Sequence, residues 1–143
     1  MNIQPYKRTA QFYETDQMGV IHHSNYIRWF EEARVDFMNQ IGYSYSRATE
    51  SGIDFALLGL SCEYKSMVRF GDLVEIQMSI TAMTPTRMTI NYLLINTRSG
   101  NICSIGETRH CFYSGKKQLP VSLKREMPEL FELMSGLISE SEG

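Results

Sequence analysis

Residues 24–42 read SNYIRWFEEARVDFMNQIG, and this stretch sets the architecture of the chain. Apolar side chains recur in it at intervals of three and four residues, which is the spacing of one face of an α-helix. They are Tyr26, Ile27, Phe30, Ala33, Phe37, Met38 and Ile41. Ser24 is a suitable N-cap and Gly42 a suitable terminator, so the pattern predicts a long amphipathic helix between them. Its broad aromatic stripe needs an apolar surface to cover, and we expect that surface to be a sheet.

Beyond this helix the sequence takes on the alternating apolar and polar period of strands. Strands are predicted at 3–13, 53–68, 73–83, 87–96 and 102–113. In the segment 73–83 the residues expected to share one face are Val74, Ile76, Met78, Ile80 and Ala82. Turn residues separate the last three strands, which indicates an antiparallel meander. A strand, a long helix and a run of strands are typical of an α+β domain with an antiparallel sheet packed on one central helix.

The length of 143 residues fits one domain, so we assign residues 1–143 to a single domain. Pro128 is suited to the first position of a short terminal helix, and the tail from about residue 136 to 143 is expected to fray. Hydrophobic residues make up 43% of the chain and charged residues 21%. Both values are close to globular averages, which excludes disordered and fibrous proteins.

Charge and cysteine content exclude further classes. A formal net charge of -2 lacks the basic excess of proteins that wrap nucleic acid, so we expect no nucleic-acid partner. Three cysteines without CxxC spacing predict reduced thiols, and neither a disulfide framework nor a zinc site. No apolar stretch approaches the about 20 residues that cross a bilayer, and the first residues lack the apolar segment of a signal peptide. We therefore expect a cytoplasmic protein without membrane insertion.

The loop before the helix, Glu14 to Asn25, carries the residues with the most distinctive chemistry. Asp16 supplies a carboxylate just upstream of a helix start, and His22 and His23 follow it. A helix N-terminus presents unpaired N–H groups and a partial positive charge, which polarise a carbonyl and stabilise an oxyanion. A nearby carboxylate can then attack that carbonyl or activate water. This combination suits hydrolysis of an ester or thioester without a metal or a serine.

The stretch TDQMGVIHHSNY at 15–26, followed by FEEAR at 30–34, resembles the signature of hotdog-fold acyl-CoA thioesterases of the 4-hydroxybenzoyl-CoA thioesterase-like group. The segment VRFGD at 68–72 is similar to the segment of that family that ends in Gly-Asp. The resemblance implies a curved antiparallel sheet wrapped around the long helix. It also implies that Asp16 is the catalytic carboxylate and that the backbone N–H at or near His23 polarises the thioester carbonyl. No metal or other bound cofactor is implied.

The same resemblance implies an acyl-CoA substrate and a homodimer or homotetramer in which each site lies between subunits. Coenzyme A would cross the interface, and its phosphates require a few basic side chains near the mouth of the pocket. We expect substrate contacts from residues of the loop and helix start and from three basic residues, namely Gly19, Val20, Tyr26, Arg87, Lys116 and Lys117.

Alternative functions start from the same residues. A hotdog hydratase or dehydratase would use Asp16 with His22 or His23 as a proton-transferring pair. A non-catalytic acyl-CoA-binding or scaffold protein would bind the thioester without turnover. Some hotdog enzymes use a helix carboxylate, but Glu31 and Glu32 have a structural explanation as ion pairs with nearby arginines on the same helix. His22, His110 and the ring of Tyr26 are most simply packed or solvated residues.

Overall fold

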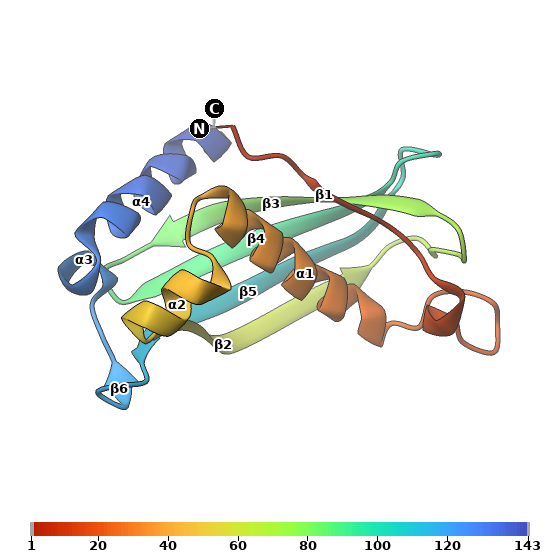
Figure 1. Cartoon of the computed structure of the whole chain (residues 1–143). Helices are drawn as coiled ribbons and strands as arrows, with labels where there is room; N and C mark the ends of the chain where they lie inside the picture. The colour runs from red at the N-terminus through yellow and green to blue at the C-terminus, as the bar shows by residue number, and fades with distance from the viewer. Residues whose placement is uncertain (1, 143) are drawn as a thin grey trace.

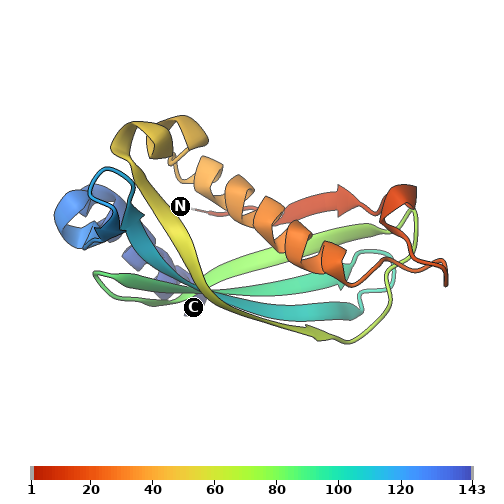
Figure 2. The same ribbon diagram turned by 90° about the horizontal axis from the view of Figure 1, so that it is seen from below.

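The helix predicted from the opening stretch lies along the concave face of a curved antiparallel sheet (Figures 1 and 2). The computed structural model describes the backbone of residues 2–142 and the side chains of residues 2–138. The elements, in chain order, are β1 (Tyr6–Thr9), the 3-10 turn η1 (Phe12–Glu14), α1 (Ser24–Gln40), α2 (Tyr45–Ser51), β2 (Ile53–Tyr64), β3 (Leu73–Met83), β4 (Arg87–Asn96), β5 (Ile102–Ser114), β6 (Leu119–Pro120), α3 (Leu123–Glu126) and α4 (Pro128–Glu142). The α+β prediction is confirmed.

The sheet is built around the predicted meander of β3, β4 and β5. Its strand order is β1-β3-β4-β5-β2, with every pairing antiparallel and with β6 paired to the end of β5. β2 returns to the outer side of β5, where Phe55 lies opposite Phe112 and Tyr64 opposite Ser104. Consequently β1 and β2 are the two edges of the sheet, and β2 is a long one.

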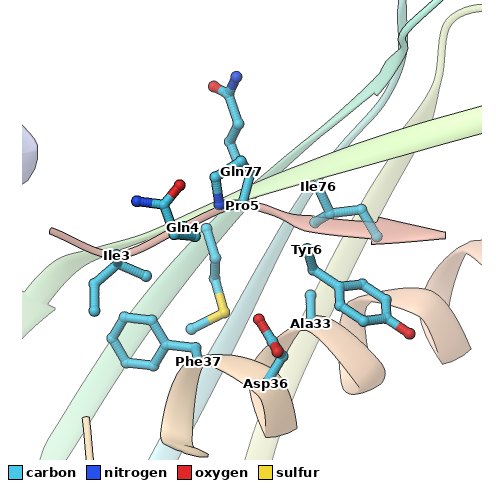
Figure 3. A pocket seen from close by; sticks show the side chains of 10 residues that line it. Ile3, Gln4, Pro5, Tyr6, Ala33, Asp36, Phe37, Ile76 and Gln77 are labelled. Carbon is cyan, nitrogen blue, oxygen red and sulfur yellow. The ribbon is translucent and has the colours of Figure 1, made fainter. Parts of the chain in front are cut away.

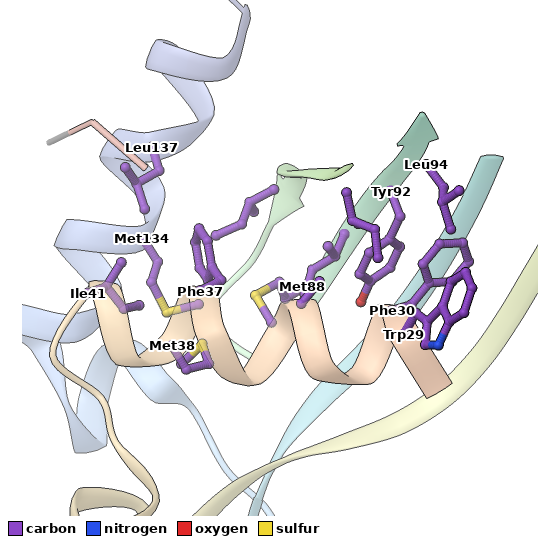
Figure 4. Close-up of a cluster of buried hydrophobic side chains, with 14 of the residues drawn as sticks. Trp29, Phe30, Phe37, Met38, Ile41, Met88, Tyr92, Leu94, Met134 and Leu137 are labelled. Atoms are coloured by element: carbon purple, nitrogen blue, oxygen red, sulfur yellow. The ribbon is translucent and has the colours of Figure 1, made fainter. Parts of the chain in front are cut away.

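The core forms where the aromatic stripe of α1 meets the inner face of the sheet. Trp29 and Phe30 lie against Tyr92 and Leu94, while Met38 and Ile41 meet the inner side of α4 (Figure 4). Phe30 stacks on Tyr92 with ring centroids 4.7 Å apart. The ring of Phe30 also covers Gly106, where a Cβ atom would come within 2.4 Å of it. Burial of each large apolar side chain contributes about 1.5–3 kcal/mol, so this contact zone fixes the helix on the sheet.

A row of buried polar groups crosses the same core. Arg34 Nη1 donates to the hydroxyl of Tyr92 at 3.0 Å, and this hydroxyl lies 2.7 Å from Thr108 Oγ1. Thr108 Oγ1 lies 2.8 Å from His110 Nε2, and His110 Nδ1 lies 3.3 Å from the carbonyl of Phe55. Since a guanidinium only donates, the row is satisfied when each hydroxyl donates onward and Nδ1 of a neutral His110 carries the proton. The predicted packed role of His110 is confirmed.

Several predicted boundaries need correction at their ends. Ser24 is the first residue of α1 and not its N-cap, because its N–H donates to the ring Nδ1 of His22 at 3.2 Å. Gly42 is confirmed as the terminator, with a φ of 85° just after the C-cap. Ala82 is exposed, because a bulge after Ile80 shifts the register of β3 against β4.

Corrections also apply to the first strand, the second strand and the tail. The first strand stops at Thr9, because the chain turns into η1 and the carboxylate of Glu14 binds the N–H of Gln11. β2 ends at Tyr64 and does not reach 68. Residues 136–138 belong to α4 and Leu137 is buried, so this part of the expected frayed tail is packed. The expectation for the remainder, 139–143, falls on residues whose side chains lie outside the described part.

Candidate functional site

Asp16 lies in a tight hairpin between η1 and α1. Its N–H donates to the carbonyl of Val20 at 2.8 Å, and the N–H of Gly19 donates to its carbonyl at 3.1 Å. Gly19 has a φ of 77°, a conformation that favours glycine, so its presence is required by the turn. Asp16 Oδ1 accepts the N–H of Met18 at 2.8 Å, whereas Oδ2 has no hydrogen-bond partner within residues 2–142. One oxygen therefore anchors the carboxylate and the other is free to meet a substrate.

The base of this hairpin is joined to the connection between β2 and β3. The N–H of Ile21 donates to the carbonyl of Val68 at 2.7 Å, and Val20 forms an isolated antiparallel bridge with Arg69. The two sequence segments that carry the family resemblance are thus in direct contact. Their contact anchors the loop to the connection between β2 and β3.

The backbone N–H groups around the start of α1 differ in their partners. The N–H of His22 donates to Glu14, and those of Asn25 and Tyr26 donate to the carbonyls of His22 and His23. The N–H of Ser24 is bound by the His22 ring. In the described part of the chain, the N–H of His23 has no acceptor. This donor lies in the first turn, where the helix dipole favours negative charge.

The two histidine rings face solvent next to this donor. They stack on each other with centroids 4.2 Å apart, and both residues are exposed. His22 Nδ1 binds the hydroxyl and N–H of Ser24, while the His23 ring meets Tyr64 edge to face at 6.2 Å. No hydrogen bond or ion pair joins Asp16 to either ring across the described residues. Within the described residues, the histidine and carboxylate pair of a hydratase is therefore not joined by a hydrogen bond.

Tyr26 and Tyr64 close the apolar side of the helix start. Tyr26 is buried, with its ring in edge contact with Trp29 and with Tyr64. Its burial raises the pKa of its hydroxyl, and burial raises that of Tyr64 to about 12, with Cys62 adding to the effect. Both phenols therefore stay protonated at neutral pH, and the hydroxyl of Tyr64 donates to the carbonyl of His23. The packing role expected for Tyr26 is confirmed, whereas its contact with substrate stays a prediction.

A buried carboxylate beside the loop was missed by sequence reasoning. Glu14 is only 6% exposed. Its Oε1 accepts from Arg8 Nη2 and from the N–H of Gln11, both at 2.9 Å, and its Oε2 accepts from Trp29 Nε1 at 2.8 Å. The spacing of Gln11 and Glu14, which forms a capping box around η1, is the one sequence signal that could have indicated a structural carboxylate.

The helix carboxylate of Glu32 has structural partners of a different kind from those expected. Arg8 Nη1 binds both oxygens of Glu32, at 2.9 and 2.8 Å, and the hydroxyl of Tyr6 donates to Oε1 at 2.7 Å. The expected pairing of Glu32 with an arginine of its own helix is wrong, because β1 brings Arg8 closer. Arg34 instead enters the buried polar row, and Glu31 has no ion pair among residues 2–138.

The predicted basic residues lie at the end of the folded domain that is opposite to Asp16. Lys116 Nζ donates to the carbonyl of Glu50 in α2 at 3.1 Å, and Lys117 forms an ion pair with Glu126 in α3. Arg87 begins β4 at the same end, beside a cavity of about 240 Å³. Figure 1 shows that α2 and α3 lie far from the loop between β1 and α1. The fold thus brings Asp16, Gly19, Val20, His23 and Tyr26 together, and separates Arg87, Lys116 and Lys117 from them.

Other hollows lie on the surface around α1. A polar one of about 450 Å³ beside the loop is lined by Tyr13, Thr15 and His22 among others, but not by Asp16. An aromatic one of about 310 Å³ lies between α1, α2 and the start of β2, with Phe55 in its wall. A third, of about 260 Å³, lies under the N-terminal segment (Figure 3). The first of these hollows is the one that adjoins the loop.

Two findings concern the chain as a whole. Over the described helices, none combines the length and apolar character needed to span a bilayer. Comparison with known proteins matches residues 10–131 to a family model described as the thioesterase-like superfamily.

Relatives and solved structures agree with this match. A protein of Aquifex aeolicus strain VF5 that is provisionally named an esterase is 34% identical to this chain over 127 residues. The match covers 89% of this chain and 96% of the relative. The acyl-CoA thioester hydrolase YbgC of Escherichia coli O6:H1 is 28% identical over 89 residues, or 62% of this chain and 66% of that protein. The crystal structure of a DHNA-CoA thioesterase from Staphylococcus aureus is 27% identical, with a TM-score of 0.89 over 97% of this chain and 93% of that one.

Proposed function

The chain belongs to the thioesterase-like superfamily and has its hotdog fold, and we propose that it hydrolyses an acyl-CoA thioester to a free acid and coenzyme A. One observation carries this proposal. Within the described residues, Asp16 Oδ2 and the N–H of His23 both lack partners, and the hairpin that carries Asp16 leads directly to His23 at the start of α1. A carboxylate and an oxyanion donor are the two groups that metal-free thioester hydrolysis requires.

In the proposed reaction, the thioester carbonyl oxygen accepts the N–H of His23, and the dipole of α1 stabilises the charge that develops on this oxygen. Asp16 then acts in one of two ways. It attacks the carbonyl carbon to form an anhydride and release the thiolate, and water cleaves the anhydride. Alternatively, it accepts a proton from water, whose oxygen attacks directly. In both routes one water is consumed and one carboxylic acid and one thiol are formed.

We also propose that the chain forms a homodimer through β2, with a homotetramer as the larger alternative. Leu57 and Leu60 are paired with His110 and Thr108, which are buried on the inner face of the sheet. Directly paired residues share a face, so both leucines belong to the inner side. They are nevertheless 53% and 38% exposed. A long, apolar and unpaired edge strand is a template for pairing with another chain.

Such a dimer explains the position of the basic residues. An antiparallel pairing of two β2 strands sets the end of one beside the start of the other. At the end of β2, Tyr64 contacts His23. Just before the start of β2, the carbonyl of Gly52 accepts the N–H of Gly115, which belongs to the turn that carries Lys116. Lys116, Lys117 and Arg87 of a second subunit would then approach the loop of the first and meet the phosphates of coenzyme A. A cytoplasmic location stays a prediction.

The test is thiol release from a panel of short, long and aromatic acyl-CoAs. We expect the wild type to turn over at least one class, and Asp16→Asn to lose about 10²-fold or more in kcat, since it removes both nucleophile and base. Glu129→Gln, which neutralises an exposed carboxylate on α4, is the matched control and should keep full activity. Full activity in folded Asp16→Asn would overturn the assignment. Binding without turnover would favour a non-catalytic protein, and water addition to an enoyl-CoA would favour a hydratase.

A further inference from the structure

Glu14 connects three elements through its side chain while its own backbone lies at the base of the Asp16 hairpin. The carboxylate accepts from Arg8 of β1, from the N–H of Gln11 and from Trp29 of α1. All its partners are donors, and it is nearly enclosed. Its position is therefore determined jointly by β1, by the N-cap of η1 and by α1.

The backbone of the same residue holds the returning leg of the hairpin. The carbonyl of Glu14 accepts the N–H of His22 at 2.8 Å and the side-chain amide of Asn25 at 3.0 Å. Asn25 Nδ2 also lies 3.3 Å from the carbonyl of His22. Asn25 is a buried residue of the first turn of α1, so its amide ties both legs of the hairpin to the helix.

These contacts fix the two reacting groups relative to each other. Asp16 follows Glu14 by two residues on one leg, and His23 follows His22 directly on the other. A displacement of about 1 Å in a positioning contact can cost about 10²-fold in rate, because the reacting atoms no longer align. We infer that Glu14 and Asn25 are positioning residues that set the distance between the Asp16 carboxylate and the N–H of His23. This inference rests on the thioesterase function proposed above.

Glu14→Gln is the informative change. A glutamine amide places an NH₂ group where a carboxylate oxygen stood, and this group must face either Trp29 Nε1 or the donors of Arg8 and Gln11. One contact is lost when the NH₂ group faces Trp29 and two are lost when it faces Arg8 and Gln11, so the side chain at position 14 shifts without any change of volume. Glu32→Gln is the matched control, because Glu32 shares Arg8 but has no contact with the hairpin in the described residues.

The experiment measures kcat, KM and Tm for both variants, with the acyl-CoA that the wild type hydrolyses fastest. We expect Glu14→Gln to lower kcat about tenfold or more, with KM within about twofold, because ground-state binding does not depend on the alignment. Glu32→Gln should keep kcat within about twofold, even if its Tm falls as far as that of Glu14→Gln, because a loss of stability alone does not move the reacting groups. Equal losses of kcat in both variants, or unchanged kcat in Glu14→Gln, would overturn the inference.

Asn25→Ala provides a second route if Glu14→Gln does not fold. It removes the amide that binds both legs while the ion pairs of Arg8 persist, and we expect the same selective loss of kcat. Unchanged kcat in folded Asn25→Ala contradicts the inference. A wild type that releases no thiol from any member of the panel contradicts the proposed function instead, so the two failures are distinguishable.

Discussion

The hydroxyl of Tyr64 donates a hydrogen bond to the backbone carbonyl of His23 at 3.2 Å, so the last residue of β2 holds the residue that precedes α1. Since the pKa of Tyr64 is raised to about 12, the phenol keeps its proton throughout the pH range of an assay. This hydrogen bond therefore links the edge strand β2 to His23, whose N–H is the proposed oxyanion donor.

Tyr64→Phe tests this connection. The change removes one hydrogen bond, worth about 0.5–1.5 kcal/mol, and we expect kcat/KM to fall by up to about tenfold. Steady-state thiol release is the measurement. Tyr45→Phe is the control, because Tyr45 is exposed and its hydroxyl has no partner among residues 2–138. Identical kinetics in the two variants would mean that the Tyr64 bond is dispensable.

The stability of the protein should depend on pH through His110. Burial, helped by the charge of Arg34, lowers the pKa of His110 from 6.5 to about 4. Between these values the unfolded chain binds more protons than the folded one, so stability is full above pH 6.5 and falls as the pH drops toward 4. The loss is at most about 3 kcal/mol, at about 1.4 kcal/mol per pKa unit.

Urea unfolding from pH 4 to 8 measures this loss. We expect the wild type to weaken over the acidic half of the range and His110→Gln, which has no proton to gain, to show a shallower slope there. A wild-type slope equal to that of the variant would remove His110 as the cause.

Gly106 should tolerate no side chain. A Cβ atom there would lie 2.4 Å from the ring of Phe30, so Gly106→Ala forces the ring off Tyr92 and should cost about 1–3 kcal/mol. Gly136→Ala in α4 is the opposite case, since nothing lies within 4 Å of the added atom, and it should gain up to about 1 kcal/mol. Thermal unfolding of both variants checks the pair, and a stabilised Gly106→Ala would show that the core can expand.

The assembly proposed for β2 predicts a mass change on substitution. Leu57→Lys puts a charge on the uncovered inner face, and we expect the dimer to dissociate at micromolar concentration, with loss of activity. Leu119→Lys on β6 is a similarly exposed leucine and should leave the mass unchanged. Light scattering after gel filtration measures both. A wild type that is monomeric at all concentrations would contradict the assembly.

Much of the fold was predictable because its determinants are local. The helical spacing around Phe30 and Phe37 and the alternation in β3 and β4 each depend on neighbours in sequence. Ala82 was misplaced because a bulge depends on the partner strand, which a single segment does not reveal. The pairing of Glu32 was misplaced for the same reason, since Arg8 reaches it only after β1 joins the sheet.

In the candidate site, too, contacts between neighbours in sequence were predictable and contacts between distant segments were not. The hairpin of Asp16 and the start of α1 are contiguous in sequence, so their proximity followed from the motif. Glu14 was missed because its partners Arg8 and Trp29 come from either side of the loop. Lys116 and Arg87 were selected for their charge, and charge does not tell which end of the sheet a turn occupies.

The buried polar row from Arg34 to the carbonyl of Phe55 has a consequence for how the sequence can diversify. Its hydrogen bonds run in one direction, so replacing Tyr92 or Thr108 by an apolar residue leaves a donor on one side and an acceptor on the other without partners. Each unmet group costs about 1–3 kcal/mol, a large share of the stability of a small domain. Arg34, Tyr92, Thr108 and His110 should accordingly be inherited as a unit, retained together or exchanged together for an apolar set.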